Sequence, residues 1–397
     1  MTTPQPLAGI TVLDFGQIYN GPYCGFLLAM AGARVIKIES PLGESLRGRS
    51  ETSSATYPFA MLNANKDAIT LNLKSERGRE LLRGLVRKAD VLLENFSPGT
   101  MDRHGVGADA LRAINPRLIY AAATGFGRTG LHRDYLAMDI TVQAMTGVMA
   151  ITGDGDGPPL KAGPALCDFL GGIHLYGAIV TALFQRERTG AGLVVDVAMQ
   201  DAVFPTLASQ IGALHYLGEH PTRNGNRHAA LSLAPYNVYR ARDGHVAIIC
   251  IREGHWRSLV AAMKRPELLL DPRFADMTSR AKHMEAVDAA VEAWTSSLTK
   301  DDVFRITQAH DVICAPVQDL HDVLEDPHLH ERGMLTRMTH PQLGSAVFPS
   351  TPLRFEGITP PALRINRALG ADNETVYGEL LGLTPNEVAQ LRVEDAI

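Results

Sequence analysis

The stretch at residues 164–172, PALCDFLGG, places an aspartate where a loop turns into a long apolar helix. Free backbone N–H groups and the helix dipole at such a position hold a carboxylate ionised and fixed in direction. Asp168 is therefore a candidate nucleophile, and the same N–H groups can stabilise an oxyanion beside it. The alternative is a purely structural N-cap. Gly171 and Gly172 have no side chains and therefore leave room for a ligand beside the start of the helix, although they reduce helix stability. This favours a catalytic or binding site over a purely structural role.

Two neighbours of Asp168 carry reactive groups of their own. Cys167 is a second candidate nucleophile at the helix end, but the sequence offers no nearby histidine to act as its base. His174 lies six positions after Asp168, so the two side chains cannot meet on one helix face. We expect a structural histidine there.

The stretch GFGRTG, residues 125–130, has the glycine spacing of a dinucleotide-binding fingerprint and follows an apolar run. A dinucleotide site needs a helix to start at once, with its N-terminus facing the pyrophosphate. Here charged residues come next, and helical periodicity returns only around Met138. The pattern therefore predicts a glycine loop that closely approaches a ligand or a strand, and it argues against an NAD site.

Apolar strand-like segments alternate with helical segments through the first half of the chain. The expected strands are ITVLDFG, ARVIKIES, AITLNLK, VLLENF, RLIYAAAT and LVVDVAMQ, with a long helix from Asp168 to Gly190 before the last of them. Such alternation is typical of βαβ units, so we predict an α/β fold around a mostly parallel, doubly wound sheet.

A second, smaller domain is expected after the loop PTRNGNRH, residues 221–228. The segment YNVYRARDGHVAIICI reads as a hairpin that turns at residues 242–244, and helices follow from Trp256. We predict a large domain of residues 1–220, completed by 331–397, and a small α+β domain of residues 221–330. A capping box from Thr384 to Glu387 starts a final helix.

Composition limits the classes of function. The 397 residues are 45% hydrophobic and 20% charged with a net charge of −5, which suits a globular enzyme and gives no basic field for nucleic acid. The four scattered cysteines form no metal-binding pattern, so we expect free thiols and no metal. The sequence shows neither a secretory signal nor an uninterrupted apolar run of about 18 residues, so we expect a cytoplasmic protein that does not cross a membrane.

Four basic residues recur at loop ends in the first half: Lys37, Lys66, Lys74 and Arg103. Each alone reads as a solvated side chain. Together, at the ends of successive strands, they are candidate ligands for the phosphates of a nucleotide-like molecule.

Several stretches in order resemble one family, the family III CoA-transferases, which includes α-methylacyl-CoA racemase as a divergent branch. The matching stretches are LAGITVLDFGQIYNGPYCGFLLAMAGARVIKIESPLGESLR, LNANKDAITLNLKSERG, ADVLLENFSPGTMDRHG, NPRLIYAAATGFGRTG, DGPPLKAGPALCDFLGGIHLYGAI and RTGAGLVVDVAMQDAV. The resemblance implies a Rossmann-like large domain built from both chain ends, a smaller inserted domain and an interlocked homodimer.

The same resemblance implies a substrate and a site. Coenzyme A or acyl-CoA is the expected substrate, with a carboxylic acid as second substrate and no permanently bound cofactor. Asp168 matches the catalytic aspartate of the family. The motif-matched positions for CoA are Tyr19, Asn20, Ser40, Leu71, Asn72, Leu73, Lys74, Asn95, Phe96, Ser97 and Arg103.

The implied mechanism uses a carboxylate that is ionised at neutral pH, because its ordinary pKa is about 3.9. Asp168 attacks the thioester to give a mixed anhydride, and the CoA thiolate then attacks the anhydride to give an aspartyl-CoA thioester. An acceptor carboxylate then attacks the aspartyl-CoA thioester, and the thiolate attacks the new anhydride to release the acceptor as its CoA thioester.

The chain departs from the family pattern in several places. Ser40 stands where formyl-CoA transferases carry arginine, Tyr19 replaces their active-site glutamine, and Asp67 replaces a frequently basic residue. Their glycine-rich loop is not visible near LSLAPYN, which argues against oxalate as a substrate.

Other functions stay open as alternatives. The racemase motif, roughly GHD, reads Ala137-Met138-Asp139 here, and methionine cannot exchange a proton. Asp139 is expected to be an N-cap. A noncatalytic acyl-CoA binding protein is a further alternative. Arg223, Arg227 and His228 are either surface charges or ligands of a second carboxylate, which would favour a dicarboxylate substrate.

Overall fold

The computed structural model describes residues 3–48, 56–218 and 223–397. The chain divides into two compact units, the first comprising Met1–Thr146, Gly163–Pro205 and Asp326–Ile397, and the second Gly147–Ala162 and Thr206–Glu325. These units differ from the expected domains at residues 147–162, 206–220 and 326–330. A turn signal marks where a helix ends, but not which unit that helix packs against. Residues 221–222 of the expected boundary loop lie outside the described residues.

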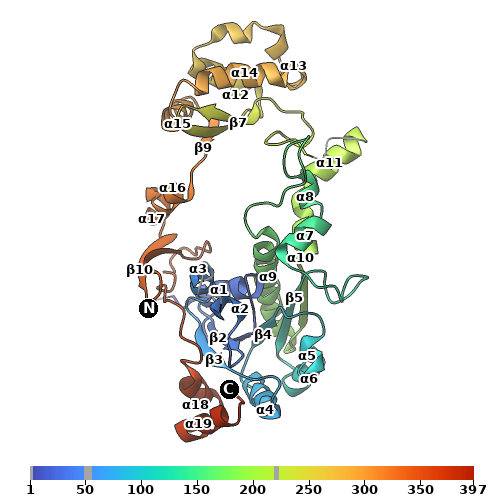
Figure 1. The fold of residues 1–397 in the computed structure, drawn as a ribbon, viewed down its shortest axis with the longest axis vertical. Coiled ribbons are helices and arrows are strands. Elements are labelled where there is room, and N and C mark those ends of the chain that lie inside the picture. The colour runs from blue at the N-terminus through green and yellow to red at the C-terminus, as the bar shows by residue number, and fades with distance from the viewer. Residues whose placement is uncertain (1–2, 49–55, 219–222) are drawn as a thin grey trace. The chain divides into compact units, whose positions relative to one another are not determined.

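A sheet of six parallel strands forms the middle of the first unit (Figure 1). The strands are β1 (Thr11–Asp14), β2 (Arg34–Glu39), β3 (Asp67–Thr70), β4 (Val91–Glu94), β5 (Ile119–Thr124) and β6 (Val194–Ala198), in the order β3-β2-β1-β4-β5-β6. Every strand coincides with an expected apolar segment, so the α/β prediction is confirmed.

Helices cover both faces of this sheet. Successive strand residues point to opposite sides, and apolar residues on both sides need a cover. Leu13 of β1 packs in a core with helices α4 (Glu76–Val86), α6 (Ala108–Ile114), α18 (Asn373–Leu381) and α19 (Pro385–Val393). Its neighbour Val12 packs in a separate core with helices α1 (Asn20–Met30) and α9 (Leu166–Thr189). The end of the chain thus completes the first unit, and the expected capping box starts α19.

Helix α9 is the expected long helix, and Gly190 ends it in a left-handed conformation with φ of 73°. Leu175, Ile179 and Leu183 bury its inner face against the sheet. Although the sequence holds no uninterrupted apolar run of the required length, α9 is long and apolar enough to cross a membrane by length and composition alone.

The second unit is built around a three-stranded antiparallel sheet of β7 (Tyr236–Ala241), β8 (Gly244–Ile249) and β9 (Ile313–Pro316). The first two strands form the expected hairpin. Helices α12 (Glu253–Met263), α14 (Met284–Thr295) and α15 (Lys300–Gln308) close its own core around Trp256.

Shorter elements complete both units. They are α2 (Ser45–Gly48), α3 (Thr56–Leu62), α5 (Thr100–Arg103), α7 (Asp139–Met145), α8 (Val148–Ile151), α10 (Met199–Val203), α11 (Ala208–Leu217), α13 (Met277–Lys282), α16 (Leu320–Leu324), α17 (Pro327–Glu331) and the antiparallel pair β10 (Leu335–His340) and β11 (Gly344–Pro349).

Candidate active site

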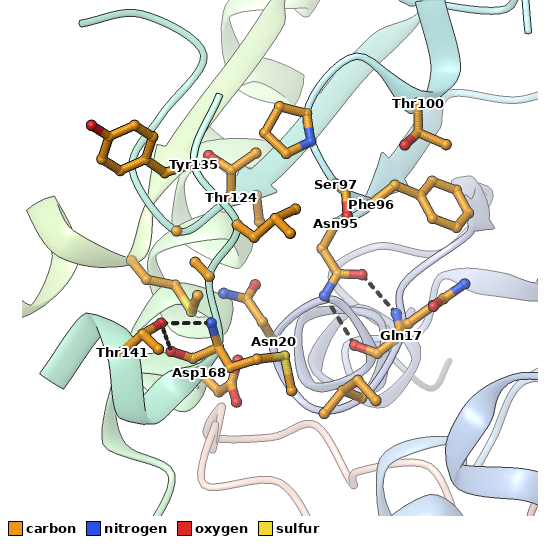
Figure 2. A pocket seen from close by; sticks show the side chains of 18 residues that line it. Gln17, Asn20, Asn95, Phe96, Ser97, Thr100, Thr124, Tyr135, Thr141 and Asp168 are labelled. Atoms are coloured by element: carbon orange, nitrogen blue, oxygen red, sulfur yellow. Dashed lines mark hydrogen bonds between the residues drawn. The ribbon is translucent and has the colours of Figure 1, made fainter. Parts of the chain in front are cut away.

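The strand order reverses direction between β1 and β4, which lie side by side in the middle of the sheet. Ligands of open parallel sheets bind beyond the carboxyl ends of the strands at such a reversal, where the two outgoing loops diverge. Asn95, after β4, joins these two loops: its amide accepts a hydrogen bond from Gln17 N (2.7 Å) and donates one to Gln17 O (2.9 Å). These two bonds are visible as dashed lines in Figure 2.

A cavity of about 500 Å³ opens at this point (Figure 2). Its lining comes from the loops after β1 and β4, the end of β5, the loop that leads from β5 into α7, helix α7, and the first residues of α1, α5, α9 and α10. The lining residues are Gln17, Ile18, Asn20, Asn95, Phe96, Ser97, Pro98, Thr100, Ala123, Thr124, Gly125, Tyr135, Leu136, Ala137, Met138, Thr141, Asp168 and Met199. Asp168 is the one charged residue among them, so it is the one carboxylate in the lining that can act as a nucleophile or as an acid–base group.

The start of α9 differs from the expectation. Ala165 is the N-cap, and Asp168 is the third residue of the helix. The carboxylate of Asp139 accepts hydrogen bonds from the backbone N–H groups of Cys167 (2.8 Å) and Asp168 (3.3 Å), while Leu166 N donates to Pro164 O. The expectations that Asp168 is an N-cap and that these N–H groups are free for an oxyanion are therefore wrong.

Asp139 itself was expected to cap α7, but Met138 is the N-cap of that helix. Asp139 is the first helical residue, and its side chain reaches across to α9 instead. A sequence cannot show this because the two partners lie 28 and 29 positions apart.

Gly171 and Gly172 of α9 serve helix packing. A Cβ atom at Gly171 would lie 2.3 Å from Nδ2 of Asn20, and one at Gly172 would lie 2.7 Å from the backbone oxygen of Asn20. Helix α1 therefore fills the space that was expected to hold a ligand, and that expectation is wrong. The close approach brings the Asn20 side chain into the cavity with Asp168 (Figure 2).

Asp168 is in an environment that disfavours its charge. Its residue is 8% exposed, and no described residue donates a hydrogen bond to its carboxyl group. Burial, together with the nearby Asp139 carboxylate, raises the pKa of Asp168 to about 7. The expectation of an ordinary pKa is thus wrong.

The thiol of Cys167 is a poor nucleophile in this structure. The residue is fully buried, and burial with the charges of Asp139 and Asp168 raises the pKa of Cys167 to about 12. A thiol with that pKa stays protonated at neutral pH. His174 is exposed and its Nδ1 bonds to Leu170 O (2.8 Å), consistent with the structural role expected for it.

Replacing Asp168 with asparagine is expected to stabilise the fold above pH 7. The folded-state pKa of about 7 exceeds the ordinary value of 3.8, so between these values the folded state holds a proton that the unfolded state has lost. Wild-type stability therefore falls as the pH rises from about 4 to 7, and the variant escapes this loss. Urea unfolding at pH 4.5 and pH 8 should show the difference between Asp168→Asn and wild type growing by about 2–4 kcal/mol. A pH-independent difference would contradict it.

Residues 7–373 match the sequence profile described as "CoA-transferase family III". The chain belongs to this family. The resemblance inferred from the sequence motifs is thereby confirmed, and the protein is a CoA-transferase.

Relatives and a solved structure agree with this assignment. The chain is 39% identical to a succinyl-CoA:mesaconate CoA-transferase of Haloarcula marismortui, over 84% of this chain and 86% of that one. It is 37% identical to a formyl-CoA:oxalate CoA-transferase of Streptomyces coelicolor over the full length of both. The crystal structure of a CAIB/BAIF family protein from Brucella suis superposes with a TM-score of 0.84 at 34% identity, covering 95% of this chain and 100% of that one.

The residues predicted to bind CoA in this family III chain fall into two groups. The first group lines the cavity with Asp168 and contains Asn20, Asn95, Phe96 and Ser97. The second lies outside the lining and contains Tyr19, Ser40, Leu71, Asn72, Leu73, Lys74 and Arg103. Their role in CoA binding stays a prediction.

Members of the second group have structural contacts of their own. Tyr19 stacks on Phe169 with ring centres 6.0 Å apart, and the Ser40 hydroxyl donates to Gly43 O (3.0 Å). Leu71 is buried in the core and Leu73 packs against the same core, whereas Lys74 is exposed. Among the hydrogen bonds of the group, Asn72 Nδ2 donates to Asp395 O (2.8 Å), Arg103 Nη1 to Pro98 O (3.0 Å) and Arg103 Nη2 to Thr100 Oγ1 (2.8 Å).

Two lysines considered as phosphate ligands are buried in ion pairs. Lys66 Nζ lies 2.7 Å from Asp14 Oδ2, and Lys37 Nζ lies 2.9 Å from Glu44 Oε2. Lys37 also donates to Gly16 O, and Asp14 accepts from Gly16 N (2.7 Å). These lysines therefore hold the β1–α1 turn that carries Gln17, and the phosphate-binding expectation is wrong for both.

The three basic residues of the second unit that were considered as carboxylate ligands are engaged in local contacts. Arg227 forms an ion pair with Asp288 (2.9 Å), Arg223 donates to Asp154 O (3.2 Å), and His228 Nδ1 bonds to Ser232 Oγ (3.2 Å). Contact of these residues with a substrate stays a prediction.

Several lining residues were missed by sequence reasoning. Gln17 lies in the loop after β1, Thr124 is the last residue of β5, and Tyr135 lies in the loop after β5. Their position at the carboxyl ends of strands was the available signal for Gln17 and Thr124. The GFGRTG stretch was singled out as a loop, and its Gly125 does line the cavity. As expected, no helix starts at Gly130; α7 begins at Asp139.

Proposed function

We propose that this CoA-transferase moves CoA from an acyl-CoA donor to a free carboxylic acid through covalent intermediates on Asp168. The single observation that carries the proposal is the position of Asp168. It is the one charged side chain lining the cavity at the strand-order reversal, it is buried, and none of the described residues donates a hydrogen bond to its carboxyl group. An anionic carboxylate without hydrogen bonds needs no general base and little desolvation before it attacks a thioester.

The proposed steps exchange one acyl bond at a time. Asp168 attacks the thioester carbon, the C–S bond breaks, and an aspartyl–acyl anhydride and CoA thiolate form. The thiolate attacks the Asp168 carbonyl, which releases the donor acid and leaves an aspartyl-CoA thioester. The acceptor carboxylate attacks this thioester, and the returning thiolate takes the acceptor acyl group and frees Asp168. Retaining the thiolate beside Asp168 makes each step local.

Cavity residues are proposed to hold the reacting end of acyl-CoA. The Asn20 amide lies beside Asp168, and its oxygen is buried without a hydrogen-bond partner in the protein. An unpaired buried amide oxygen costs free energy, so it is suited to accept a hydrogen bond from the ligand. Asn95, Phe96 and Ser97 line the opposite wall.

The nucleotide end of CoA is proposed to extend beyond the cavity along the loops at the carboxyl ends of the strands. Lys74 and Arg103 are the cations there for its phosphates, with Tyr19, Ser40 and residues 71–73 as neighbouring contacts; buried Leu71 would contribute only its backbone. The parallel strand order supports this Rossmann-like arrangement. We propose no permanently bound cofactor.

The acceptor is proposed to be a dicarboxylate. Mesaconate and oxalate, named for two relatives, each carry two carboxyl groups. Met138 lines the cavity where the racemase branch carries histidine, which supports transfer over α-proton exchange.

A substrate survey tests the proposal. Purified enzyme is mixed with succinyl-, acetyl- or formyl-CoA and a panel of mono- and dicarboxylates in deuterated buffer, and products are followed by chromatography and mass spectrometry. We expect a new acyl-CoA to appear in step with loss of the donor thioester. Deuterium at the acyl α-carbon without movement of CoA would instead identify a racemase. Binding without either product would identify a noncatalytic binding protein.

We also propose an interlocked homodimer located in the cytoplasm. Exposed apolar side chains on the first unit, Ile173 and Phe184 of α9 and Phe204 after α10, support burial against a second copy. All four cysteines are free thiols, which supports a reducing compartment.

A further inference from the structure

Helix α9 has an unusual partner at its N-terminus, the carboxylate of Asp139 from α7. We infer that Asp139 is a positioning residue that keeps the Asp168 carboxylate free of hydrogen bonds and beside a second negative charge, and so promotes its acylation. This inference rests on the function proposed for Asp168.

The contacts of Asp139 fix its position on both sides. One carboxylate oxygen accepts from Cys167 N (2.8 Å) and Asp168 N (3.3 Å), and the other accepts from Nε2 of Gln143 (2.6 Å). Gln143 is fully buried on α7, whereas the two N–H groups belong to α9. The carboxylate of Asp139 is therefore held between these two helices. An N-cap side chain ordinarily bonds to these N–H groups, but the N-cap of α9 is Ala165, which has no polar side chain. Asp139 occupies them, and Asp168 is left to face the cavity.

The charge of Asp139 has a consequence for each step of the reaction. Two carboxylates close together in a buried site repel each other. In both proposed intermediates Asp168 itself carries no charge: in the anhydride the negative charge lies on the CoA thiolate, and in the thioester it leaves with the released donor acid. Acylation therefore moves the charge off Asp168, and Asp139 favours the acylated forms over the free carboxylate.

Few other groups can set the charge of Asp168. No lysine, arginine or histidine lines the cavity among the described residues. The titratable groups nearby are the Cys167 thiol on α9, Tyr135 in the cavity wall, and two tyrosines whose rings pack on Phe169. These are Tyr19, the N-cap of α1, and Tyr23 within α1. These groups are ordinarily neutral at pH 7. On α10, Asp201 is exposed to solvent.

The test compares Asp139→Asn with wild type. Asparagine keeps an oxygen for the N–H groups of α9 and removes the charge, and the Gln143 amide can turn to match it. In ¹³C-aspartate-labelled enzyme, with Asp168→Asn used to assign the signal, the titration midpoint of the Asp168 carboxyl should fall by at least about one pH unit. The pH at which kcat/KM reaches half its maximum should fall with it. Acyl-enzyme trapped at Asp168 at pH 8 should fall about tenfold, the factor that corresponds to one unit.

Asp109→Asn is the matched control, because Asp109 is also an aspartate in the first turn of a helix, α6, and is exposed. It should leave all three measurements unchanged. If Asp139→Asn does not fold, Asp139→Ser offers a shorter neutral cap for the same titration. If the titration midpoint of Asp168 is unchanged in a folded Asp139 variant, the inference is overturned, even when that variant is active. If Asp139→Asn lowers the titration midpoint of Asp168 but the wild type never forms an adduct, the electrostatic role of Asp139 is supported and the proposed function is not.

Discussion

Asp168→Asn is expected to lower the rate of CoA transfer by at least about 10³-fold, because the amide cannot form an anhydride or a thioester with CoA. The substitution removes the nucleophile and changes little else, because the carboxyl group has no hydrogen bond to lose within the part of the chain that the structure describes. Transfer rates are measured with the best donor and acceptor from the substrate survey. In parallel, wild-type enzyme incubated with acyl-CoA and hydroxylamine should be modified at Asp168.

CoA affinity is the control for this variant, measured by calorimetry. It should stay within about threefold of wild type or improve, because the variant removes a buried charge and keeps the cavity. A folded Asp168→Asn enzyme that exchanges thioesters at full speed would rule out the covalent mechanism, whichever residue then proved responsible.

Lys66→Met is expected to cost about 3–5 kcal/mol of the free energy of unfolding, because it leaves Asp14 buried and without its cation. Both side chains of this pair are essentially inaccessible to solvent, and Lys66 also donates to Pro22 O (2.9 Å) and Asn63 Oδ1 (3.1 Å). Burial lowers the pKa of Lys66, yet the Asp14 carboxylate opposes that effect. Chemical denaturation with the wild type as reference measures the loss.

Lys74→Met provides the matched comparison, since Lys66 precedes β3 and Lys74 is an exposed lysine that follows the same strand. Its stability should change by less than about 0.5 kcal/mol, while CoA affinity should fall because a proposed phosphate ligand is lost. The opposite pattern, a stable Lys66→Met protein that fails to bind CoA, would restore Lys66 as a phosphate ligand and contradict the buried ion pair.

Local patterns predicted much of the fold. The six strands of the parallel sheet, the long helix ending at Gly190 and the capping box at Thr384 all follow from local periodicity and from residues close to one another in the chain. The charged residues after Gly130 were enough to distinguish the GFGRTG loop from a dinucleotide site. The family assignment also came from ordered motifs, and residues 7–373 match that family.

The sequence by itself therefore determined the α/β class, the family and the candidacy of Asp168. Only the tertiary structure decided how that residue is charged and what surrounds it. Lys66 meets Asp14 across 52 positions, and Asp139 meets the start of α9 across 28 and 29. The physical reason is that ionisation depends on burial and on nearby charges, and both are set by which segments fold together rather than by which residues are adjacent in the chain.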